Sequence, residues 1–356
     1  MASKRIVIFG WTDSIHIQKW VAGLQGRGYE LKVITLGCPE LKNCLTINFP
    51  RRNRLAYFYY AGAAAREALQ FKPDLVHAHY ISGFGLWALK TNFIPTVASV
   101  WGSDIKSSKR GFFGRKIANR LLSKMTTITA TSSFLKSKVV DINPEFESKI
   151  EVIPFGVDTT EDYKPLPAEK TFRLCYIKRL RPVYGPDVML KALALAKKTN
   201  PDILLSIAGN GEMSAELHKM VKELDLEKNV EFIGFIDNKE IYPFISKHHA
   251  VVMPSREEGF GVAALEAGIC GRPIIATNVG GIPEIVINNK TGILIPRDDH
   301  HALSQAMLLL AEDRKLTENL GRQGYNYVKE KYSWESSLDK MVSLYERLID
   351  ESKKTK

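Results

Sequence analysis

Several features that would define a protein class are absent from this sequence of 356 residues. No apolar run approaches the roughly 18 residues that a membrane-spanning helix needs. The four cysteines form neither a CxxC pair nor a metal-ligand spacing, which argues against disulfide and zinc frameworks. The fingerprint GxGxxG does not follow the first expected strand, which disfavours a nicotinamide or flavin cofactor. With 45% hydrophobic and 25% charged residues, the composition is that of a soluble globular protein.

The first residues, MASKRIVIFG, contain neither a long apolar region nor a small-residue cleavage site, so we expect a cytoplasmic protein. The formal net charge is +11, and residues 1–164 carry +10 of it, with 23 Lys and Arg against 13 Asp and Glu. A basic half attracts nucleic acid, an anionic membrane surface or a phosphorylated substrate. Because no helix-turn-helix, zinc finger or RNA-binding aromatic motif is visible, we expect no specific nucleic acid partner.

Short strand-like runs alternate with amphipathic helical segments along the whole chain. The expected strands are residues 5–9, 31–36, 74–78, 96–100, 126–131 and 149–154, and then 172–177, 203–208, 230–234, 250–253 and 273–277. Near-continuous apolar strands that alternate with helices predict α/β domains with parallel sheets. We therefore expect two doubly wound, Rossmann-like domains, with a polar linker over residues 156–170.

The expected domain limits are residues 1–160 and 161–332, followed by a C-terminal helix within residues 333–356. Two doubly wound domains place the crevices at the carboxyl ends of their strands facing one another, so a cleft between them is the expected site. The last helix has one apolar face and needs a surface to cover, which either domain could supply; a return to the first domain is one option. Its apolar residues are Leu338, Met341, Leu344, Tyr345 and Leu348.

The densest chemical signal is the segment PSREEGFGVAALEA, residues 254–267, which follows an expected strand and leads into a helix. Gly259 and Gly261 let backbone amides approach a ligand, and the helix start offers N–H groups to an anion. Glu258 and Glu266 are eight residues apart, or about 12 Å along a helix, so they suit two ends of an extended polar ligand. The alternative is that Glu258 only complements the helix dipole and Glu266 lies on a solvated face.

A basic tripeptide pattern follows the first strand of the second domain. Lys178, Arg179 and Arg181 stand at a strand end just before an expected helix start. Cations in that place suit a diphosphate, which arginine can bind through two hydrogen bonds. A solvated basic loop is the alternative.

In the first domain, polar side chains follow two neighbouring expected strands. His79 ends the third strand, and Asp104 follows the fourth, just after Trp101. A histidine in this place could serve as an acid or base, or it could simply be satisfied by hydrogen bonds. Asp104 is equally well explained as a turn or capping residue.

Two basic segments of the first half also carry aromatic residues. One surrounds Phe112 and Phe113 with lysines and arginines between residues 106 and 124, and the other places Tyr57, Phe58, Tyr59 and Tyr60 after a run of arginines at residues 51–54. Such segments could rest on an anionic membrane. The alternatives are a solvated basic helix face and aromatics that pack into the core.

Taken in order, these segments resemble the retaining, nucleotide-sugar-dependent glycosyltransferases of family 4, which have the two-domain GT-B fold. Glu258 and Glu266 stand where that family has its E-x7-E motif. The resemblance covers nearly the whole chain. Its other segments are IKRLRPVYG, LLSIAGNGEM, VEFIGFI, NVGGIPEIV and NKTGILIP, preceded in the first half by DSIHIQKWVAGLQGRGYELKVIT, PDLVHAH and VWGSDI.

The resemblance implies that the second domain binds a UDP- or GDP-sugar donor. Glu258 would hold the sugar with the amides of Gly259, Phe260 and Gly261, while Glu266 would accept the ribose hydroxyls. The wider donor-binding set would comprise Arg179, which neutralises the leaving diphosphate, with Lys178, Arg181, Val262, and Ile236, whose backbone contacts the base.

The resemblance also implies an acceptor site on the first domain and a set of catalytic residues. The acceptor would lie near Thr12, Asp13, Ser14, His16 and Trp101. The catalytic set would consist of Arg179, Glu258, Asp104 and His79.

Two positions depart from the family pattern. Tyr184 stands where the family often has a lysine, so a second diphosphate cation is missing, and Lys178 or Arg181 could substitute for it. Trp101 stands where the family often has a histidine that contacts the donor sugar; only the Trp101 carbonyl could keep part of that role.

In the family, retention is pictured as a displacement on one face of the sugar, in which the departing phosphate takes the acceptor's proton. The protein's contribution is then electrostatic stabilisation of the leaving group. The absence of a D-x-D triplet agrees with this, and we expect neither an essential metal nor another cofactor, with Arg179 in place of a metal.

We therefore expect a retaining hexosyl- or N-acetylhexosaminyl-transferase. Its acceptor would be a glycan, a lipid-linked molecule or a small molecule. We expect the enzyme to act in the synthesis of cell-envelope glycans or glycolipids. A location at the cytoplasmic membrane face is expected if the basic first domain meets anionic lipid. A non-catalytic nucleotide-sugar binding protein on the same fold is the alternative function.

Overall fold

The computed structural model describes residues 3–50, 54–106, 111–160 and 162–354. The chain forms two compact units, one made of Met1–Phe155 with Glu335–Lys356 and the other of Gly156–Trp334. The divisions between the units fall after Phe155 and after Trp334. The limits expected from the sequence were residues 160 and 332.

Over the described residues, the first unit contains a seven-stranded parallel sheet with the strand order β3-β2-β1-β4-β5-β6-β7. The central strands are almost fully buried, as expected for a sheet covered by helices on both faces, whereas the edge strands β3 and β7 are partly exposed. The strands are β1 (Arg5–Phe9), β2 (Glu30–Leu36), β3 (Leu45–Phe49), β4 (Leu75–His79), β5 (Thr96–Val100), β6 (Thr127–Ala130) and β7 (Ile150–Val152).

Helices cover both faces of this sheet. One face of the strands, including Phe9, Val76 and Val100, forms an apolar core with the helices α2, α3, α5 and α6. The helices of the unit are α1 (Ile15–Gly26), α2 (Arg54–Gln70), α3 (Phe84–Thr91), α4 (Ser103–Lys106), α5 (Gly111–Ser123), α6 (Ser133–Val140), the 3-10 helix η2 (Pro144–Lys149) and the C-terminal α13 (Trp334–Lys354).

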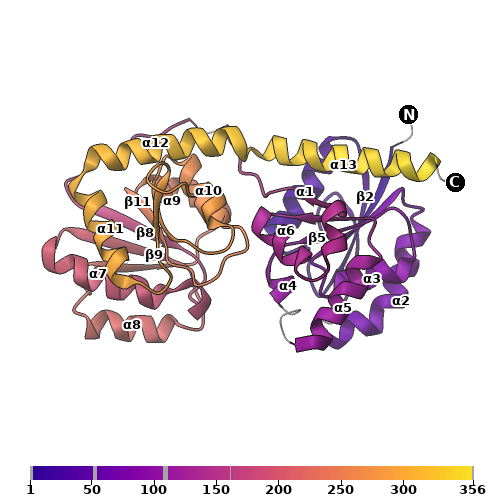
Figure 1. Ribbon diagram of the computed structural model, residues 1–356, viewed down its shortest axis with the longest axis horizontal. Helices are drawn as coiled ribbons and strands as arrows, with labels where there is room; N and C mark the ends of the chain where they lie inside the picture. Colours follow the sequence, from indigo (N-terminus) through magenta and orange to yellow (C-terminus); the bar gives the residue numbers. More distant parts are fainter. Residues whose placement is uncertain (1–2, 51–53, 107–110, 161, 355–356) are drawn as a thin grey trace. The chain divides into compact units, whose positions relative to one another are not determined.

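Helix α13 packs on the first unit through its apolar stripe. Leu338, Met341, Leu344, Tyr345 and Leu348 are all buried. The hydroxyl of Tyr345 is hydrogen-bonded to Nδ1 of His77 in β4, and Arg27 at the end of α1 forms ion pairs with Glu335 and Asp339 of α13. The C-terminal helix thus completes the first unit, although it follows the second unit in sequence (Figure 1).

The second unit contains, in its described part, a six-stranded parallel sheet with the strand order β10-β9-β8-β11-β12-β13. Its main apolar core lies between this sheet and the helices α7, α8 and α11. The strands are β8 (Phe172–Ile177), β9 (Ile203–Ala208), β10 (Val230–Gly234), β11 (Ala250–Met253), β12 (Ile274–Thr277) and β13 (Gly292–Ile295). The helices are η3 (Pro182–Tyr184), α7 (Pro186–Thr199), α8 (Ser214–Glu223), α9 (Asn238–Ser246), α10 (Val262–Ile269), η4 (Ile282–Glu284), α11 (His300–Glu312) and α12 (Arg314–Lys331).

Some elements differ from those expected from the sequence. The expected strands do not include β3 and β13, each of which lies at one edge of its sheet. In β3, Thr46 and Asn48 interrupt the apolar residues, and β13 is a short strand of four residues. The expected strand at residues 149–154 is shorter, because Lys149 ends the 3-10 helix η2 and only Ile150–Val152 pair with β6. Helix α13, in contrast, begins directly after Ser333 and ends at Lys354, within the residues 333–356 expected for it.

Within the described ranges, no helix is both long and apolar enough to cross a membrane. The same residues contain no group of three or more His, Cys, Asp or Glu side chains arranged to hold a metal ion.

Candidate functional site

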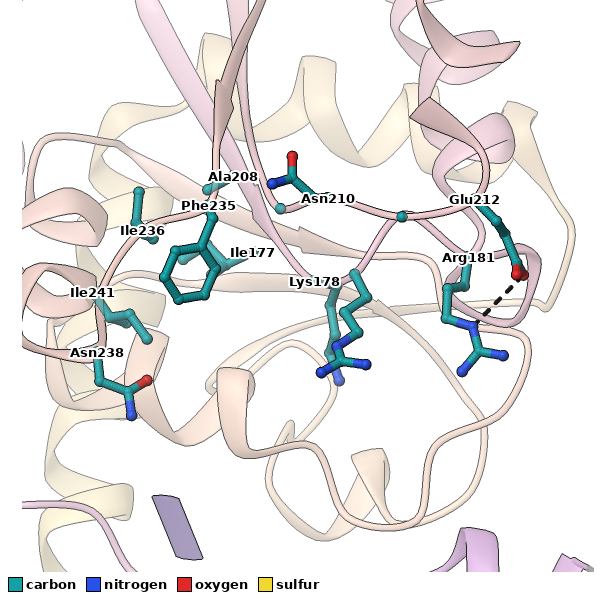
Figure 2. A pocket seen from close by; sticks show the side chains of 13 residues that line it. Ile177, Lys178, Arg181, Ala208, Asn210, Glu212, Phe235, Ile236, Asn238 and Ile241 are labelled. Carbon is teal, nitrogen blue, oxygen red and sulfur yellow. Dashed lines mark ion pairs between the residues drawn. The ribbon is translucent and has the colours of Figure 1, made fainter. Parts of the chain in front are cut away.

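A cavity of about 550 Å³ opens in the second unit at the carboxyl ends of β8, β9 and β10. The loop after β8 supplies three cations to its lining: Lys178, Arg179 and Arg181. Residues 208–212 line it after β9, and residues 235–241 supply apolar and amide side chains after β10. Figure 2 shows the cations and the apolar group toward opposite ends of the cavity. This is the edge at which open α/β sheets bind ligands.

Lys178 forms an ion pair with Glu258 that joins the cavity to the segment before α10. The Lys178 ammonium donates a hydrogen bond to Oε2 of Glu258, and both side chains are mostly buried. Burial alone lowers the pKa of Lys178, but the charge and hydrogen bond of Glu258 outweigh it and raise the pKa above its usual value. The charge of Glu266 acts in the same direction. Lys178 therefore stays charged, and both carboxylates of the E-x7-E spacing act on it.

The backbone of Glu258 is held by a close contact with a glycine-containing turn. Its carbonyl accepts a hydrogen bond from the amide of Gly281. Gly280 has φ +61°, and a Cβ atom there would lie 1.7 Å from the Glu258 carbonyl oxygen. Only a residue without a side chain permits this approach, so the sequence GGIPE fixes the backbone of Glu258 although more than twenty residues separate them.

Helix α10 begins immediately after this loop. Its N-cap is Gly261, with φ +105°, which has no side chain to accept hydrogen bonds from the first amides of the helix. A helix start of this kind attracts an anion. The preceding residue Phe260 is buried, whereas Gly259, Val262 and Glu266 are partly exposed.

The two arginines predicted for the donor site lie in more open surroundings than Lys178. Arg181 pairs with Glu212 at 3.6 Å, and both side chains are more than half exposed (Figure 2). Arg179 is exposed at the cavity lining, and its carbonyl accepts a hydrogen bond from the Tyr176 hydroxyl. Ile236 lines the other part of the cavity and is half-buried.

Two features of this unit were missed by sequence reasoning. Phe235, which precedes Ile236, is 74% exposed and lines the cavity. An aromatic residue beside the predicted base contact was the available signal. Arg256, two residues before Glu258, binds Asp187 in the first turn of α7 through two hydrogen bonds. No local sequence signal identifies a pair separated by 69 residues.

In the first unit, the predicted residues gather around an aromatic cluster at the carboxyl ends of β1, β4 and β5. The His16 ring stacks on Phe155 with centroids 3.9 Å apart, and Trp101 lies 5.4 Å from His79 and 5.7 Å from His16. His79 is buried and stacks on His77, and both of its ring nitrogens lack a hydrogen-bond partner within the described chain. Burial, with a smaller contribution from His16, lowers the pKa of His79 to about 3. The ring is therefore neutral at pH 7.

Asp104 lies in the short helix α4 and is buried. Its carboxylate accepts hydrogen bonds from the backbone amides of Ile81 at 3.2 Å, Trp101 at 3.2 Å and Gly102 at 2.8 Å. Burial raises its pKa to about 6, although these amides oppose the shift. This arrangement matches a turn aspartate, because the carboxylate ties together the loops after β4 and β5.

The loop between β1 and α1 carries the remaining acceptor-side candidates. The Thr12 hydroxyl is buried and donates to the carbonyl of Pro39 at 2.5 Å. Asp13 is exposed and accepts a weak hydrogen bond from Cys38 Sγ at 3.4 Å. Ser14 is the N-cap of α1 without a side-chain capping bond. The donor-side candidates thus gather in the second unit and the acceptor-side candidates in the first.

Comparison with known families matches both units. Residues 158–327 match the model of "Glycosyl transferases group 1", and residues 5–132 match that of "Glycosyl transferase 4-like". Among curated relatives, an uncharacterized glycosyltransferase of Methanocaldococcus jannaschii is 27% identical over 347 residues, which is 95% of each chain. A D-inositol 3-phosphate glycosyltransferase of Pseudarthrobacter chlorophenolicus is 29% identical over 70% of this chain and 65% of its own length.

Solved structures with this fold cover nearly the whole chain. A sucrose-phosphate synthase from Thermosynechococcus elongatus has a TM-score of 0.83 at 21% identity, covering 98% of this chain and 99% of its own. Anabaena HepE, solved in complex with UDP and glucose, has a TM-score of 0.81 at 18% identity, covering 97% of this chain and 100% of its own. These likenesses establish the GT-B fold. The two family models, which together match residues in both units, support the assignment of this chain to the glycosyl transferases of the group 1 and 4-like families.

Proposed function

We propose that the protein is a retaining glycosyltransferase that moves a hexosyl or N-acetylhexosaminyl group from a UDP- or GDP-sugar to an acceptor. The observation that carries this proposal is the joining of the cationic cavity after β8 to the start of α10 through the Lys178–Glu258 ion pair. One place then offers cations and helix amides for a diphosphate and a carboxylate for sugar hydroxyls. HepE structures with UDP and with UDP-glucose support this class of donor.

In this proposal, the nucleotide occupies the cavity. The base lies in the part lined by Phe235 and Ile236, where an exposed aromatic ring offers a stacking surface. Glu266 accepts the ribose hydroxyls. The diphosphate meets Arg179 and the amides of Gly259–Gly261 that precede α10.

The proposed chemistry takes place on one face of the sugar. The bond between the anomeric carbon and the diphosphate breaks while the acceptor oxygen bonds to the same face of that carbon. The acceptor proton passes to the departing phosphate oxygen, so that no separate base is required. Arg179 and the helix amides stabilise the negative charge that develops on the leaving group, and Glu258 orients the sugar. We expect no essential metal.

The acceptor is proposed to bind the first unit near Trp101 and His79. A lipid-linked or glycan acceptor of cell-envelope synthesis, presented at a cytoplasmic anionic membrane, is favoured by the surface of helices α2 and α5. Leu55, Phe58 and Tyr59 of α2 are each more than 70% exposed. Tyr57 and Tyr60, in contrast, pack against the core.

Helix α5 adds charge to this surface. Ile117 is exposed between the exposed cations Lys116 and Arg120, and both α2 and α5 pack against α3. Exposed apolar side chains beside cations suit an anionic lipid surface. Some basic and aromatic residues of the two segments lie outside what the structure describes. These are Arg51, Arg52, Lys109 and Arg110, together with the side chains of Arg54, Lys106, Phe112 and Phe113.

The test of the proposed function is a donor assay with an anomeric readout. The wild-type protein, with UDP-glucose, UDP-N-acetylglucosamine or GDP-mannose, is expected to release a nucleoside diphosphate from one donor, slowly with water and faster with the right acceptor. NMR of the product is expected to give the donor's anomeric configuration. Glu258→Gln should abolish turnover.

A non-catalytic nucleotide-sugar binding protein is the alternative, for which Trp101 and Tyr184 are the motivating residues. Binding of a donor without any release of nucleoside diphosphate would favour it. Product with the inverted configuration would contradict the proposed mechanism but not the enzyme class.

A further inference from the structure

We propose that Lys178 supplies the second cation for the donor diphosphate, and that the Glu258 carboxylate and the Tyr184 ring hold its ammonium in place until the donor binds. This inference rests on the proposed function. From the sequence, Lys178 and Arg181 were equal candidates for the second diphosphate cation, and the inference selects Lys178. In it, the Tyr184 ring helps to hold the Lys178 ammonium.

The position of Lys178 is fixed by the backbone around it. Lys178 directly follows β8, and its amide donates to the carbonyl of Ala208 at the end of β9. Gly209, with φ +146°, packs so closely that a Cβ atom there would lie 2.0 Å from the Lys178 carbonyl oxygen. The backbone from which this side chain extends is therefore fixed, and the position of the ammonium depends on the groups that contact it.

Two groups hold the ammonium. It forms an ion pair with Glu258 and lies 4.9 Å from the centroid of the Tyr184 ring, within the range of a cation–π interaction. An ammonium group has three N–H donors, so the bond to Glu258 leaves others for a phosphate oxygen. The Tyr184 ring attracts the cation without adding a negative charge of its own. The site thus holds a charged ammonium, paired with Glu258, at the cavity.

Burial distinguishes Lys178 from the other candidate. The Lys178 side chain is 15% exposed, whereas Arg181 is 52% exposed and pairs with the exposed Glu212. Coulombic attraction is several times stronger in a partly buried site than in water, so the same charge acts more strongly on a diphosphate from Lys178. Figure 2 shows the ion pair between Nε of Arg181 and the carboxylate of Glu212.

The Glu258 pairing links this cation to the helix start. Glu258 lies four residues before Val262, where α10 begins, and its backbone is fixed by the turn at Gly280 and Gly281. An anion at the uncapped amides of α10 would therefore approach the ammonium bound to Glu258. Lys178 then contacts the diphosphate from the strand β8 side, while the amides contact it from the α10 side.

The test separates diphosphate recognition from nucleoside recognition by calorimetry. UMP and UDP, and GMP and GDP, are titrated into the wild-type protein and into Lys178→Met, Arg181→Met and Lys219→Met. Lys219 is a matched control, because it is a lysine of the same unit in an exposed pair with Glu223. Lys178→Met is expected to lower the diphosphate affinity by about tenfold to a hundredfold. The monophosphate affinity should change much less, and Lys219→Met should change neither.

A second variant tests the geometry. The double variant Lys178→Met, Tyr184→Lys places a lysine at position 184, whose side chain contacts the Lys178 ammonium in the wild type. The new ammonium should recover most of the lost diphosphate affinity. Lys178→Gln replaces Lys178→Met if the latter does not fold. Two results would overturn the inference and leave the proposed function intact. One is an unchanged ratio of diphosphate to monophosphate affinity in Lys178→Met. The other is a larger loss of diphosphate affinity in Arg181→Met than in Lys178→Met. A wild-type protein that binds none of these nucleotides would overturn both.

Discussion

Arg256 and Asp187 are joined by two parallel hydrogen bonds, from Nη1 to Oδ1 at 2.9 Å and from Nη2 to Oδ2 at 2.7 Å. Arg256 lies two residues before Glu258, and Asp187 lies in the first turn of α7. The Arg256 Nε also donates to Oδ1 of Asp298 at 2.6 Å. The guanidinium thus ties the loop that carries Glu258 to two other segments, and we infer that it maintains the position of that carboxylate.

We predict that Asp187→Asn lowers the free energy of unfolding at pH 7 by about 1–2 kcal/mol. Charge-assisted hydrogen bonds contribute about 1.5–3 kcal/mol, and partial exposure reduces that value. Burial raises the pKa of Asp187, but the hydrogen bonds and charge of Arg256 outweigh it, so that the pKa lies below its usual value. The contribution of Asp187 is therefore complete above the unfolded-state pKa of about 4, and is lost as the pH falls through the lower folded-state pKa.

Urea unfolding at pH 7 and at successively lower pH values measures this effect. The difference between wild type and Asp187→Asn should shrink as the pH falls below about 4. A difference that persists unchanged at pH 2 would show that the stability comes from shape or packing and not from the charge.

His79→Phe should leave the protein at least as stable at pH 7, because it removes two buried nitrogens without hydrogen-bond partners and keeps a ring in the aromatic cluster. In contrast, Tyr345→Phe removes the partner of a buried His77 nitrogen and should cost about 1–3 kcal/mol. Thermal and urea unfolding of both variants test this contrast. Marked destabilisation by His79→Phe would mean that its nitrogens are satisfied in solution.

The same variant has a signature in the pH dependence of stability. Because the folded-state pKa of His79 is about 3, its neutral form stabilises the folded protein above the unfolded-state pKa of about 6.5, and this stability is lost as the pH falls toward 3. The free energy of unfolding of the wild type should therefore fall more steeply than that of His79→Phe over this window, by up to about 1.4 kcal/mol per pH unit. Equal slopes would contradict the buried neutral state of His79.

The α2 surface predicts binding to anionic vesicles. Wild-type protein should sediment with vesicles that contain phosphatidylglycerol, more weakly at high salt, and not with phosphatidylcholine alone. The triple variant Leu55→Ser, Phe58→Ser, Tyr59→Ser should bind at least about tenfold more weakly, since each buried apolar side chain contributes about 1.5–3 kcal/mol. Leu309→Ser, at an exposed apolar position of α11 in the second unit, is the matched control. If the wild-type protein bound neither kind of vesicle, the proposed binding to an anionic membrane would be wrong.

The central strands could be predicted from the sequence because they are buried on both faces and are therefore continuously apolar, as in Ile203–Ala208. Among the edge strands of the two described sheets, β7 and β10 were expected but β3 and β13 were not. Leu45–Phe49 has exposed and half-buried residues and resembles a polar loop. The glycines and carboxylates near α10 were identifiable as a local pattern. The Lys178–Glu258 pair was not, since 80 residues separate its members and only the neighbouring positions of β8 and β11 in the sheet bring them together.

The central claim, that the second unit binds a nucleoside diphosphate and its sugar conjugate through Glu266 and the cavity after β8, is tested most directly by calorimetry. Wild type and Glu266→Ala are titrated with UDP, GDP, ADP and their common sugar conjugates. The account predicts that one nucleotide binds tightly to the wild type and about tenfold to a hundredfold more weakly to the variant, because its ribose hydroxyls lose a charged acceptor. Absence of binding to every nucleotide, or equal affinities in the two proteins, would contradict it.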